Sequence, residues 1–247
     1  MGKKVLGIDV GASAVKGGIV DLKKGEMISE RFKIKTGVPP SPIAEVVEAF
    51  AKIVAHFDWK GEIGVGFPAI VKNNVIYSAS NVDKAWIGKD IQKIFGERVK
   101  LPVFAVNDAD AAGMAERAFG GGKGQKGTVI LLTLGTGIGS AFFRDGVLVP
   151  NTELGHLKFR GDIAEKYCSS RIKETEGLSM KKWGRRLDRY LLHIEHLFSP
   201  DLILIGGGIS RKFDNFKEHL TVKTEVRPAE MKNIAGIVGA AMAGDFA

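Results

Sequence analysis

Residues 103–116, VFAVNDADAAGMAE, pass from a buried strand straight into a helix. The first four residues are apolar, as in a strand covered on both faces, and the alanine-rich residues after Asp108 favour a helix. Asn107 and Asp108 therefore fall at the joint, where a strand delivers side chains to the edge of a sheet. A carboxylate at such a joint can accept a proton from a bound hydroxyl group. Because Asp is also a preferred helix N-cap, this stretch by itself leaves both roles open for Asp108.

The composition indicates a folded, turn-rich α/β protein. The chain has 247 residues, 45% of them hydrophobic, and 32 glycines. No apolar run approaches the roughly 18 residues of a membrane span, and residues 1–4 lead into a strand without an apolar signal segment. Cys168 is the single cysteine, which excludes an internal disulfide and a multi-cysteine zinc site. We therefore expect a cytoplasmic protein that is not inserted in a membrane.

The charge balance is basic, with 36 Lys and Arg against 28 Asp and Glu and a net charge of +8. Such an excess favours polyanionic partners, namely nucleic acid, polyphosphate or an acidic membrane, but a solvated surface explains it equally well. A long helix is expected at residues 179–198, and its apolar stripe leaves most of the other surface to Lys181, Lys182, Arg185, Arg186 and Arg189. We interpret this basic run as a solvated face, with polyanion binding as the alternative.

Two glycine-containing hairpins have the pattern of phosphate-binding turns. Residues 9–17, DVGASAVKG, join two strands through small residues, and residues 129–141, VILLTLGTGIGSA, repeat the arrangement in the second half. Backbone N–H groups of such turns can surround a phosphate. Asp9 could hold a hydrated Mg²⁺ and Lys16 could place a charge on a phosphate oxygen, although an ordinary hairpin is the alternative. One hairpin in each half predicts a duplicated α/β domain around a cleft.

A glycine-rich basic segment at residues 120–127, GGGKGQKG, is the expected boundary between the halves. We expect a flexible connector there, an N-terminal α/β domain at residues 1–119 and a C-terminal α/β domain at residues 120–233. Residues 234–247 include a helix of small residues, which permit tight packing, so we expect this helix to pack back on the first domain. A triple-glycine turn at residues 206–208 follows a buried strand and lets the backbone approach a nucleotide or a phosphate chain closely.

Polar side chains in several loops are candidates for holding a sugar. Asn81 belongs to a polar loop around Trp86, whose ring could pack on a sugar; a surface loop fixed by a half-buried tryptophan is the alternative. Glu153 and His156 flank a glycine bend, so both can point at one ligand, and Glu165 follows in a short polar insert. Ordinary hydrogen-bonded loop residues without a catalytic role are the alternative here.

Together these features favour phosphoryl transfer to a polyhydroxy acceptor. Such catalysis is mostly positioning and charge stabilisation, in which backbone N–H groups, a cation and Mg²⁺ neutralise the phosphoryl oxygens. A base must also lie within hydrogen-bonding reach of the attacking hydroxyl group. We assign that role to Asp108, the one carboxylate at a strand-to-helix joint with an adjacent asparagine.

Several motifs resemble those of the ROK (repressor, open reading frame, kinase) sugar kinases. They are Asp9-x-Gly with Lys16, residues 107–111 (NDADA), residues 134–139 (LGTGIG) and Gly155 with His156. Residues 81–88 (NVDKAWIG), 150–156 (PNTELGH) and 206–212 (GGGISRK) resemble the polyphosphate glucokinase branch of that family. The resemblance covers nearly the whole chain.

This resemblance implies an actin-like (ribonuclease H-like) two-domain ATPase fold, usually a homodimer, that transfers the terminal phosphate of inorganic polyphosphate, often also of ATP, to the 6-hydroxyl of glucose. By matching motif positions, Asp108 is the general base, and glucose is held by Asn81, Asn107, Asp108, Glu153, His156 and Glu165. The residues expected to bind phosphate are Asp9, Gly11, Ser13, Lys16, Gly135, Thr136, Gly137, Gly207 and Gly208. Mg²⁺ is the expected cofactor, held by Asp9 through water.

One departure from the wider family concerns zinc. Many members carry a cysteine-rich zinc site after the Gly–His pair, whereas this chain has only Cys168. We therefore expect no zinc here, and some other interaction must order the insert that carries Glu165.

The alternative functions differ in the phosphate donor that the protein uses and in whether the protein is catalytic. Basic loop residues could guide a long polyphosphate to the site, and the candidates are Lys84, Lys123, Lys126, Arg171 and Lys173. A strictly ATP-dependent glucokinase or hexokinase is the alternative, because the family fold serves both donors. A non-catalytic sugar sensor or repressor is less favoured: those relatives carry an N-terminal DNA-binding helix-turn-helix, whereas this chain starts within three residues of its first phosphate strand, so we expect no nucleic-acid partner.

Overall fold

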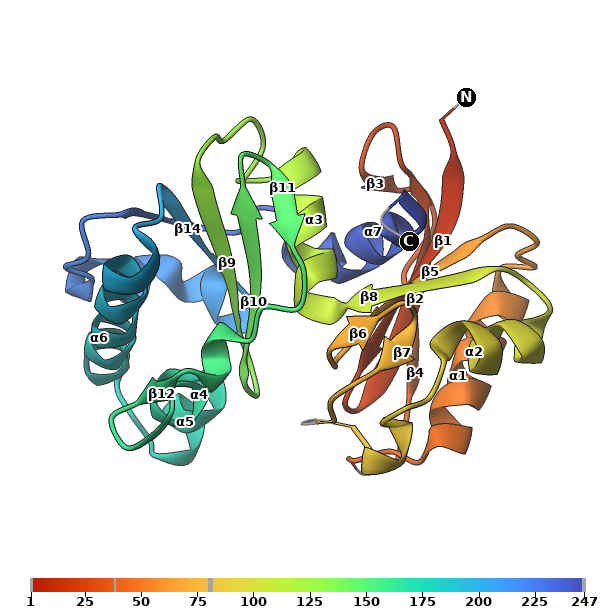
Figure 1. Cartoon of the computed structure of the whole chain (residues 1–247), viewed down its shortest axis with the longest axis horizontal. Coiled ribbons are helices and arrows are strands. Elements are labelled where there is room, and N and C mark those ends of the chain that lie inside the picture. The colour runs from red at the N-terminus through yellow and green to blue at the C-terminus, as the bar shows by residue number, and fades with distance from the viewer. Residues whose placement is uncertain (1, 38, 80–81, 246–247) are drawn as a thin grey trace. The chain divides into compact units, whose positions relative to one another are not determined.

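The computed structural model describes residues 2–37, 39–79 and 82–245 and divides the chain into two compact units (Figure 1). Unit 1 comprises Met1–Ala115 together with Ile234–Ala247, and unit 2 comprises Glu116–Asn233. The C-terminal segment therefore belongs to the same unit as the N-terminus.

Unit 1 is built on a six-stranded mixed sheet in the order β3-β2-β1-β5-β8, with β4 also paired to β2. Strands β1 and β2 are antiparallel, whereas β1, β5 and β8 run parallel to one another. The strands are β1 (Lys4–Gly11), β2 (Ala14–Asp21), β3 (Glu26–Met27), β4 (Phe32–Lys35), β5 (Ile63–Phe67) and β8 (Val103–Asn107).

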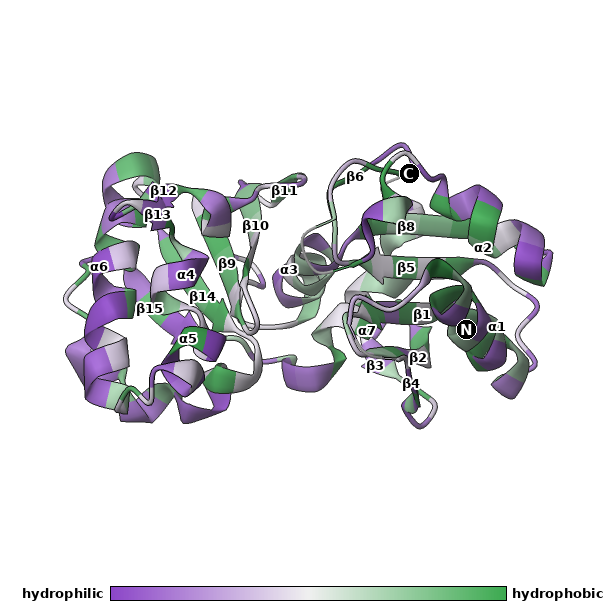
Figure 2. Ribbon diagram, turned by 90° about the horizontal axis from the view of Figure 1, so that it is seen from below, coloured by the Kyte–Doolittle hydropathy of each residue, from purple (hydrophilic) through white to green (hydrophobic). Residues whose placement is uncertain are grey.

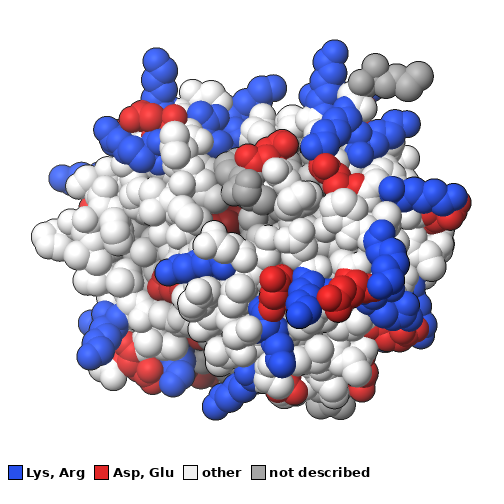
Figure 3. Space-filling model, turned by 45° about the vertical axis from the view of Figure 1, so that its right-hand side comes forward, with Lys and Arg blue, Asp and Glu red and all other residues white. Residues whose placement is uncertain are grey.

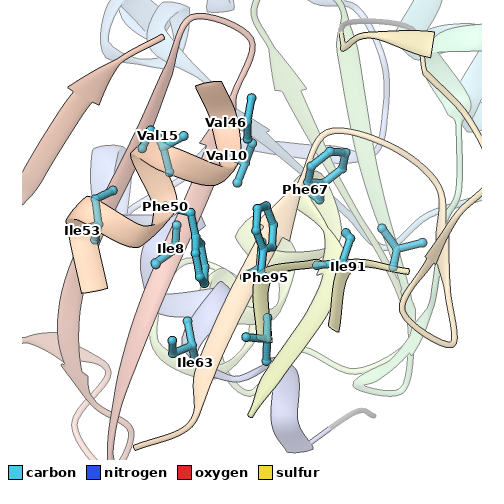
Figure 4. Close-up of a cluster of buried hydrophobic side chains, with 14 of the residues drawn as sticks. Ile8, Val10, Val15, Val46, Phe50, Ile53, Ile63, Phe67, Ile91 and Phe95 are labelled. Atoms are coloured by element: carbon cyan, nitrogen blue, oxygen red, sulfur yellow. The ribbon is translucent and has the colours of Figure 1, made fainter. Parts of the chain in front are cut away.

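Helices α1 (Ile43–His56) and α2 (Ile91–Val99) pack on one face of this sheet and enclose the core of unit 1 (Figure 4). Phe50 of α1 and Phe95 of α2 stack with their ring centroids 4.3 Å apart. The buried side chains of both helices recur at helical spacing, which is the pattern that predicts α1 from the sequence. A short hairpin, β6 (Val71–Lys72) and β7 (Val75–Ile76), turns through Asn73 and Asn74, both with positive φ.

Helix α7 (Ala235–Ala241) lies on β1 and β5 at very close range. A Cβ atom on Gly7 would collide with the carbonyl oxygen of Ile237, and a Cβ atom on Gly64 would collide with that of Ala240. Glycine on the strands and small residues on the helix therefore let two backbones approach each other directly.

Unit 2 repeats the strand order of unit 1 in a five-stranded sheet, β11-β10-β9-β14-β15. As in unit 1, the hairpin strands are antiparallel, here β11–β10 and β10–β9, whereas the pairs β9–β14 and β14–β15 are parallel. The strands are β9 (Thr128–Leu134), β10 (Ile138–Arg144), β11 (Val147–Val149), β14 (Leu202–Gly206) and β15 (Glu225–Pro228). The repeated order confirms the duplicated α/β fold predicted from the two hairpins.

Helix α6 (Met180–Phe198) is the main cover of the second sheet. Its apolar stripe is buried in the core of unit 2, and Figure 2 shows green alternating with purple along it. The Ser179 hydroxyl accepts the backbone N–H of Lys182 at 3.2 Å and begins the helix as an N-cap. None of the helices in the described part of the chain combines the length and the apolar composition that a membrane span requires.

The remaining elements are short. Strands β12 (Lys158–Phe159) and β13 (Asp162–Ile163) pair with each other, and helices α4 (Glu165–Cys168) and α5 (Ser170–Thr175) follow them. Short 3₁₀ helices lie at Lys84–Trp86, Leu154–His156, Gly208–Asn215, Lys217–His219, Lys232–Ile234 and Ala243–Asp245.

The start of the segment that we expected to be a flexible connector is instead held in place. Helix α3 (Asp108–Phe119) ends there, and its Glu116 carboxylate, only 1% exposed, accepts the backbone N–H of Gly121 at 3.0 Å. The same carboxylate accepts the N–H groups of Glu230 at 3.1 Å and Met231 at 2.7 Å. The expectation of flexibility at the first glycines of this segment was therefore wrong, because composition does not reveal that a buried carboxylate anchors them.

Candidate active site

The first phosphate hairpin places two opposite charges side by side. In the β1–β2 pair Gly11 is opposite Ala14, so the turn consists of Ala12 and exposed Ser13. Asp9 and Lys16 are opposite each other, with the Lys16 Nζ 2.8 Å from a carboxylate oxygen of Asp9. Both side chains keep partial access to solvent, at 29% for Lys16 and 20% for Asp9. The hairpin thus offers a carboxylate, an ammonium group and a small-residue turn in one place.

Asn107, rather than Asp108, caps helix α3. The Asn107 Oδ1 accepts the backbone N–H groups of Ala109 at 2.8 Å and Asp110 at 3.0 Å, while its Nδ2 donates to the carbonyl oxygen of Ala69 at 3.0 Å. Asn107 is 7% exposed. Its amide is therefore largely committed to the fold, which weakens the expected role as a direct sugar ligand. Asp108 is half-buried and becomes the first residue of α3, as the joint predicted from the sequence requires.

The register of the parallel strands brings these two features to one edge of the sheet. Asp9 on β1 is aligned with Gly66 on β5, and Gly66 is aligned with Val106 on β8. Asp9 and Asp108 therefore both stand at the carboxyl ends of strands, separated by β5 alone. Open α/β sheets bind ligands at this edge. The sequence predicted the two carboxylates separately, and the register brings them together.

The second phosphate turn lies at the same end of the sheet in unit 2. Residues 135–137 connect β9 to β10; the Gly135 N–H donates to the carbonyl oxygen of Gly137 at 3.0 Å, and the Gly135 carbonyl accepts the N–H of Arg171 at 3.0 Å. Thr136 is exposed. The turn is thus closed on itself and attached to helix α5.

The triple-glycine turn lies against this second phosphate turn. Gly207 has φ of +80°, and a Cβ atom there would collide with the carbonyl oxygen of Leu134. A Cβ atom on Gly135 or Gly208, by contrast, would meet no described group within 4 Å. Glycine is therefore required at Gly207 for close packing, whereas Gly135 and Gly208 leave open space beside a backbone that a phosphate could approach.

Glu153, His156 and Glu165 form one polar group in unit 2. The His156 Nδ1 lies 3.5 Å from the Oε2 of Glu153, and its Nε2 lies 3.8 Å from the Oε1 of Glu165. Burial raises the pKa of the Glu153 carboxyl; His156 opposes this and Glu165 adds to it. An imidazole between two carboxylates offers several acceptors and a donor in one place, which suits a sugar bearing several hydroxyl groups. The structure thus brings together three residues that the sequence proposed from two separate loops.

Ser140 fixes the backbone on both sides of Glu153. This β10 residue is 1% exposed; its hydroxyl donates to the carbonyl oxygen of Thr152 at 2.5 Å and accepts the N–H of Leu154 at 3.0 Å. A Cβ atom on Gly155 would collide with the carbonyl oxygen of Ile138, so the same loop lies directly on the start of β10. We did not predict Ser140 as a site residue, although a serine between small and apolar residues in a strand was a usable signal.

The insert that carries Glu165 is ordered by helix α6. The Trp183 indole N–H donates to the carbonyl oxygens of Cys168 at 3.0 Å and Ser169 at 3.2 Å. The Glu165 Oε2 accepts the N–H of Ile138 at 3.2 Å. Cys168 is buried, and burial raises the pKa of its thiol far above its usual value, so it acts as packing. The indole supplies the ordering interaction that the sequence required without identifying it.

The loop around Trp86 differs from the expected sugar-binding surface. The Trp86 ring is 0% exposed and packs edge-on against Phe67, with centroids 5.0 Å apart. It is therefore a core residue and offers no ring face to a ligand; an aromatic residue in a polar loop does not reveal its depth. Asn81, the predicted ligand from this loop, lies outside the described residues.

The basic residues proposed to guide polyphosphate are mostly on the surface. Lys84, Lys123, Lys126 and Arg171 are exposed, and Lys173 is half-buried. Lys and Arg alternate with Asp and Glu over the face drawn in Figure 3, so the charge of +8 does not form one continuous patch there. Across residues 2–37, 39–79 and 82–245, no group of three or more His, Cys, Asp or Glu side chains is arranged to hold a metal ion.

Comparison with known proteins assigns the family. The sequence profile described as "ROK family" matches residues 5–173. The chain is also 48% identical over 238 residues to a polyphosphate glucokinase of Mycobacterium tuberculosis, a match that covers 96% of this chain and 89% of that protein. The chain belongs to the ROK family. A glucokinase of Streptomyces coelicolor is a more distant relative, 27% identical over 311 aligned positions that cover 96% of each protein.

Solved structures carry the same fold. The inorganic polyphosphate/ATP-glucomannokinase of Arthrobacter sp. strain KM superimposes with a TM-score of 0.93 at 47% identity and 97% coverage of both chains. A ROK family glucokinase from Streptomyces griseus superimposes with a TM-score of 0.84 at 24% identity, over 98% of this chain and 100% of that one, a likeness of fold alone. The predicted actin-like ROK sugar kinase fold is thereby confirmed.

Proposed function

We propose that this ROK protein is a glucokinase that transfers the terminal phosphate of inorganic polyphosphate, and also of ATP, to the 6-hydroxyl of glucose. The observation that carries the proposal is the capped joint at Asn107 and Asp108, which presents a carboxylate at the ligand-binding edge of the sheet. The relatives named as polyphosphate glucokinase and as polyphosphate/ATP-glucomannokinase support the choice of donors and acceptor.

In the proposed reaction Asp108 acts as the general base. Its carboxylate accepts the proton of the glucose 6-hydroxyl while that oxygen forms a bond to the terminal phosphorus of the donor. The bond between this phosphorus and its bridging oxygen breaks, and the shortened polyphosphate, or ADP, leaves with the electron pair. Asn107 contributes indirectly, because its cap fixes the start of α3 and hence the position of Asp108.

Glu153, His156 and Glu165 are the proposed glucose ligands from unit 2. Two carboxylates and an imidazole can accept and donate hydrogen bonds to neighbouring sugar hydroxyls at once. Such fixed contacts place the reacting hydroxyl, which is how most of the rate enhancement in phosphoryl transfer arises. We retain Asn81 as a proposed ligand on the family resemblance alone.

Asp9 is the proposed contact for Mg²⁺. Its partly exposed carboxylate offers the hard oxygen that Mg²⁺ prefers, and this ion usually keeps several waters and binds through few carboxylates plus substrate phosphates. When bound, Mg²⁺ would neutralise charge on the phosphoryl oxygens. Lys16, Gly11, Ser13 and the glycine turns of unit 2 are the proposed phosphate-binding groups, and the surface residues Lys84, Lys123, Lys126, Arg171 and Lys173 the proposed guide for a long chain.

Steady-state kinetics with each donor test the proposal. Purified protein with Mg²⁺ should form glucose 6-phosphate from glucose with either polyphosphate or ATP, and a parallel series with mannose defines the acceptor. Turnover with ATP alone would establish the strictly ATP-dependent alternative and leave the fold and Asp108 unaffected. Glucose binding without turnover on any donor would instead establish a sugar sensor.

Two further properties remain proposals. The family resemblance implies a homodimer, which light scattering of the purified protein would test. The cytoplasm is the proposed location, and fractionation of the producing cells would test it.

A further inference from the structure

Three arginine side chains gather around Tyr167, outside the groups assigned to catalysis. The Arg189 guanidinium donates to the Tyr167 hydroxyl at 3.0 Å. The guanidinium carbons of Arg186 and Arg160 lie 5.1 Å and 5.6 Å from the centre of the Tyr167 ring. Tyr167 comes from α4, Arg160 from the turn between β12 and β13, and the other two from α6. We call these four residues the Tyr167 arginine cluster.

The positive charge of the cluster exceeds the negative charge of the carboxylates that pair with it. Arg186 pairs with Glu176 at 2.6 Å and also donates to the Tyr167 carbonyl oxygen at 3.3 Å, so it is fixed structurally. For the exposed residues Arg160 and Arg189, no ion pair to a carboxylate is present within the described part of the chain. Nearby Asp162 pairs with Lys166 at 3.4 Å. Two guanidinium groups are therefore left to solvent or to an anion.

The geometry suits phosphate groups in particular. A guanidinium presents a planar set of N–H donors that matches phosphate oxygens, often through two hydrogen bonds at once. The Tyr167 hydroxyl orients one guanidinium, and the ring face attracts the others. Holding the donors in place before binding reduces the ordering that a ligand must bring about. Several such donors around one ring fit a polymer that carries a charge on every unit.

The cluster is also connected to the second phosphate turn. Helix α5 follows α4 directly, and its Arg171 N–H donates to the carbonyl oxygen of Gly135. The segment that carries Tyr167 is therefore fixed to the backbone that we propose binds the donor phosphate.

We propose that the Tyr167 arginine cluster is a separate binding site for inorganic polyphosphate, which holds a part of the chain away from its reacting end. The proposal rests on polyphosphate being a donor for this protein. A long polyphosphate held at two places binds more tightly than its reacting end alone, because the second contact is intramolecular. A short donor such as ATP or tripolyphosphate gains nothing from the cluster.

The test compares a double variant with a charge-matched control. Arg160→Gln with Arg189→Gln removes both uncompensated charges but keeps most of each stem, and Arg186 is left intact. The control is Arg185→Gln together with Lys182→Gln, which removes two exposed charges from α6, the helix that carries Arg189, and leaves the four residues of the cluster unchanged. We expect the cluster variant to raise the KM for long-chain polyphosphate about tenfold, with kcat and the KM values for ATP, tripolyphosphate and glucose unchanged. Equal changes in both variants would overturn the proposal.

Equilibrium binding separates this proposal from the choice of donor. Fluorescently labelled long-chain polyphosphate should bind the cluster variant about tenfold more weakly than the wild type and the control. Selective loss of binding in a protein that turns over only ATP would show that the cluster binds polyphosphate but would overturn both its role in holding a donor chain and the donor assignment. Unchanged polyphosphate binding overturns the site, and an accompanying selective loss of RNA binding would identify a nucleic-acid surface instead. Tyr167→Phe, which removes the acceptor for Arg189, should give a smaller loss in the same direction.

Discussion

The two sheets share one strand order but carry different side chains at corresponding positions. In unit 1 the first hairpin pairs Asp9 with Lys16, whereas in unit 2 the corresponding hairpin pairs Thr133 with Gly139. One hairpin therefore presents charges, and the other presents backbone beside glycines. The same strand order thus occurs twice, and the residues near the strand ends give each sheet a different chemistry.

The two sheets also differ in the segments that follow their strands and in the side chains that these segments carry. In unit 1, β8 runs directly into α3 and places Asp108 at its first turn. In unit 2, β11 leads into a loop and an insert that carry Glu153, His156 and Glu165. We propose a matching division of roles, in which Asp108 is the reacting carboxylate and Glu153, His156 and Glu165 hold the sugar. The predictions below test that division, from the largest expected effect to the smallest.

Replacing the proposed base of unit 1 should have the largest effect. Asp108→Asn should lower kcat by about 10²- to 10⁴-fold with both donors, because the amide cannot accept the sugar proton. Glucose affinity, measured by calorimetry, should change little. Asp90→Asn is a matched control, since Asp90 caps α2 in the same unit and asparagine also caps well. A near-normal kcat in the Asp108 variant would leave that residue as part of the helix start only.

Replacing a proposed sugar ligand of unit 2 should act mainly on binding. Glu153→Gln should raise the KM for glucose by about 10- to 100-fold, since a hydrogen bond to a charged acceptor is replaced by a weaker one. Glu174→Gln, at an exposed position of α5 in the same unit, is the control. If kcat fell as far as in the Asp108 variant while KM stayed constant, the division between the units would be wrong.

The raised pKa of Glu153 adds a pH dependence to this comparison. Its carboxylate becomes protonated at a higher pH than an ordinary glutamate, so wild-type glucose affinity should fall as the pH drops through that raised pKa. Glu153→Gln should lack this acidic limb. Because the pKa of Glu153 is raised in the folded protein, protonated Glu153 stabilises the fold at low pH, and this stabilisation is lost as the pH rises through that pKa. At neutral pH, denaturant unfolding should therefore show that Glu153→Gln is at least as stable as the wild type.

Removing the support of the sugar-binding loop should have a moderate effect. Ser140→Ala leaves the Thr152 carbonyl and the Leu154 N–H without their partner, which should cost about 1–3 kcal/mol in unfolding free energy and raise the KM for glucose several-fold. Ser29→Ala in unit 1, where the hydroxyl accepts the Ile19 N–H at 2.9 Å, is the control. A KM change equal to that of the control would make Ser140 purely structural.

Loosening the insert of unit 2 should have the smallest effect. Trp183→Phe keeps an aromatic ring in the core but removes the N–H that donates to Cys168 and Ser169, at a cost of about 0.5–1.5 kcal/mol plus any loss of packing. Hydrogen exchange should increase around residues 164–169. Trp59→Phe, which removes an indole hydrogen bond to Glu62 in unit 1, is the control. Unchanged exchange in the insert would mean that packing alone orders it.

The sequence by itself determined the parts of this protein that depend on local pattern. Apolar runs separated by glycine turns predicted the two hairpins. The change from an apolar run to alanine-rich residues predicted the strand-to-helix joint at Asp108. The order of motifs gave the family. These features depend on neighbours in the chain, and such neighbours are visible in a sequence.

The tertiary structure alone decided which group each of these residues contacts. Asn107 caps α3 and binds the carbonyl of Ala69 on a distant segment, Trp86 is buried in the core, and the carboxylate of Glu116 holds a glycine segment expected to be flexible. The Tyr167 arginine cluster likewise joins residues from three elements. Burial and hydrogen bonding depend on which segments fold against each other, and composition and spacing do not specify those partners.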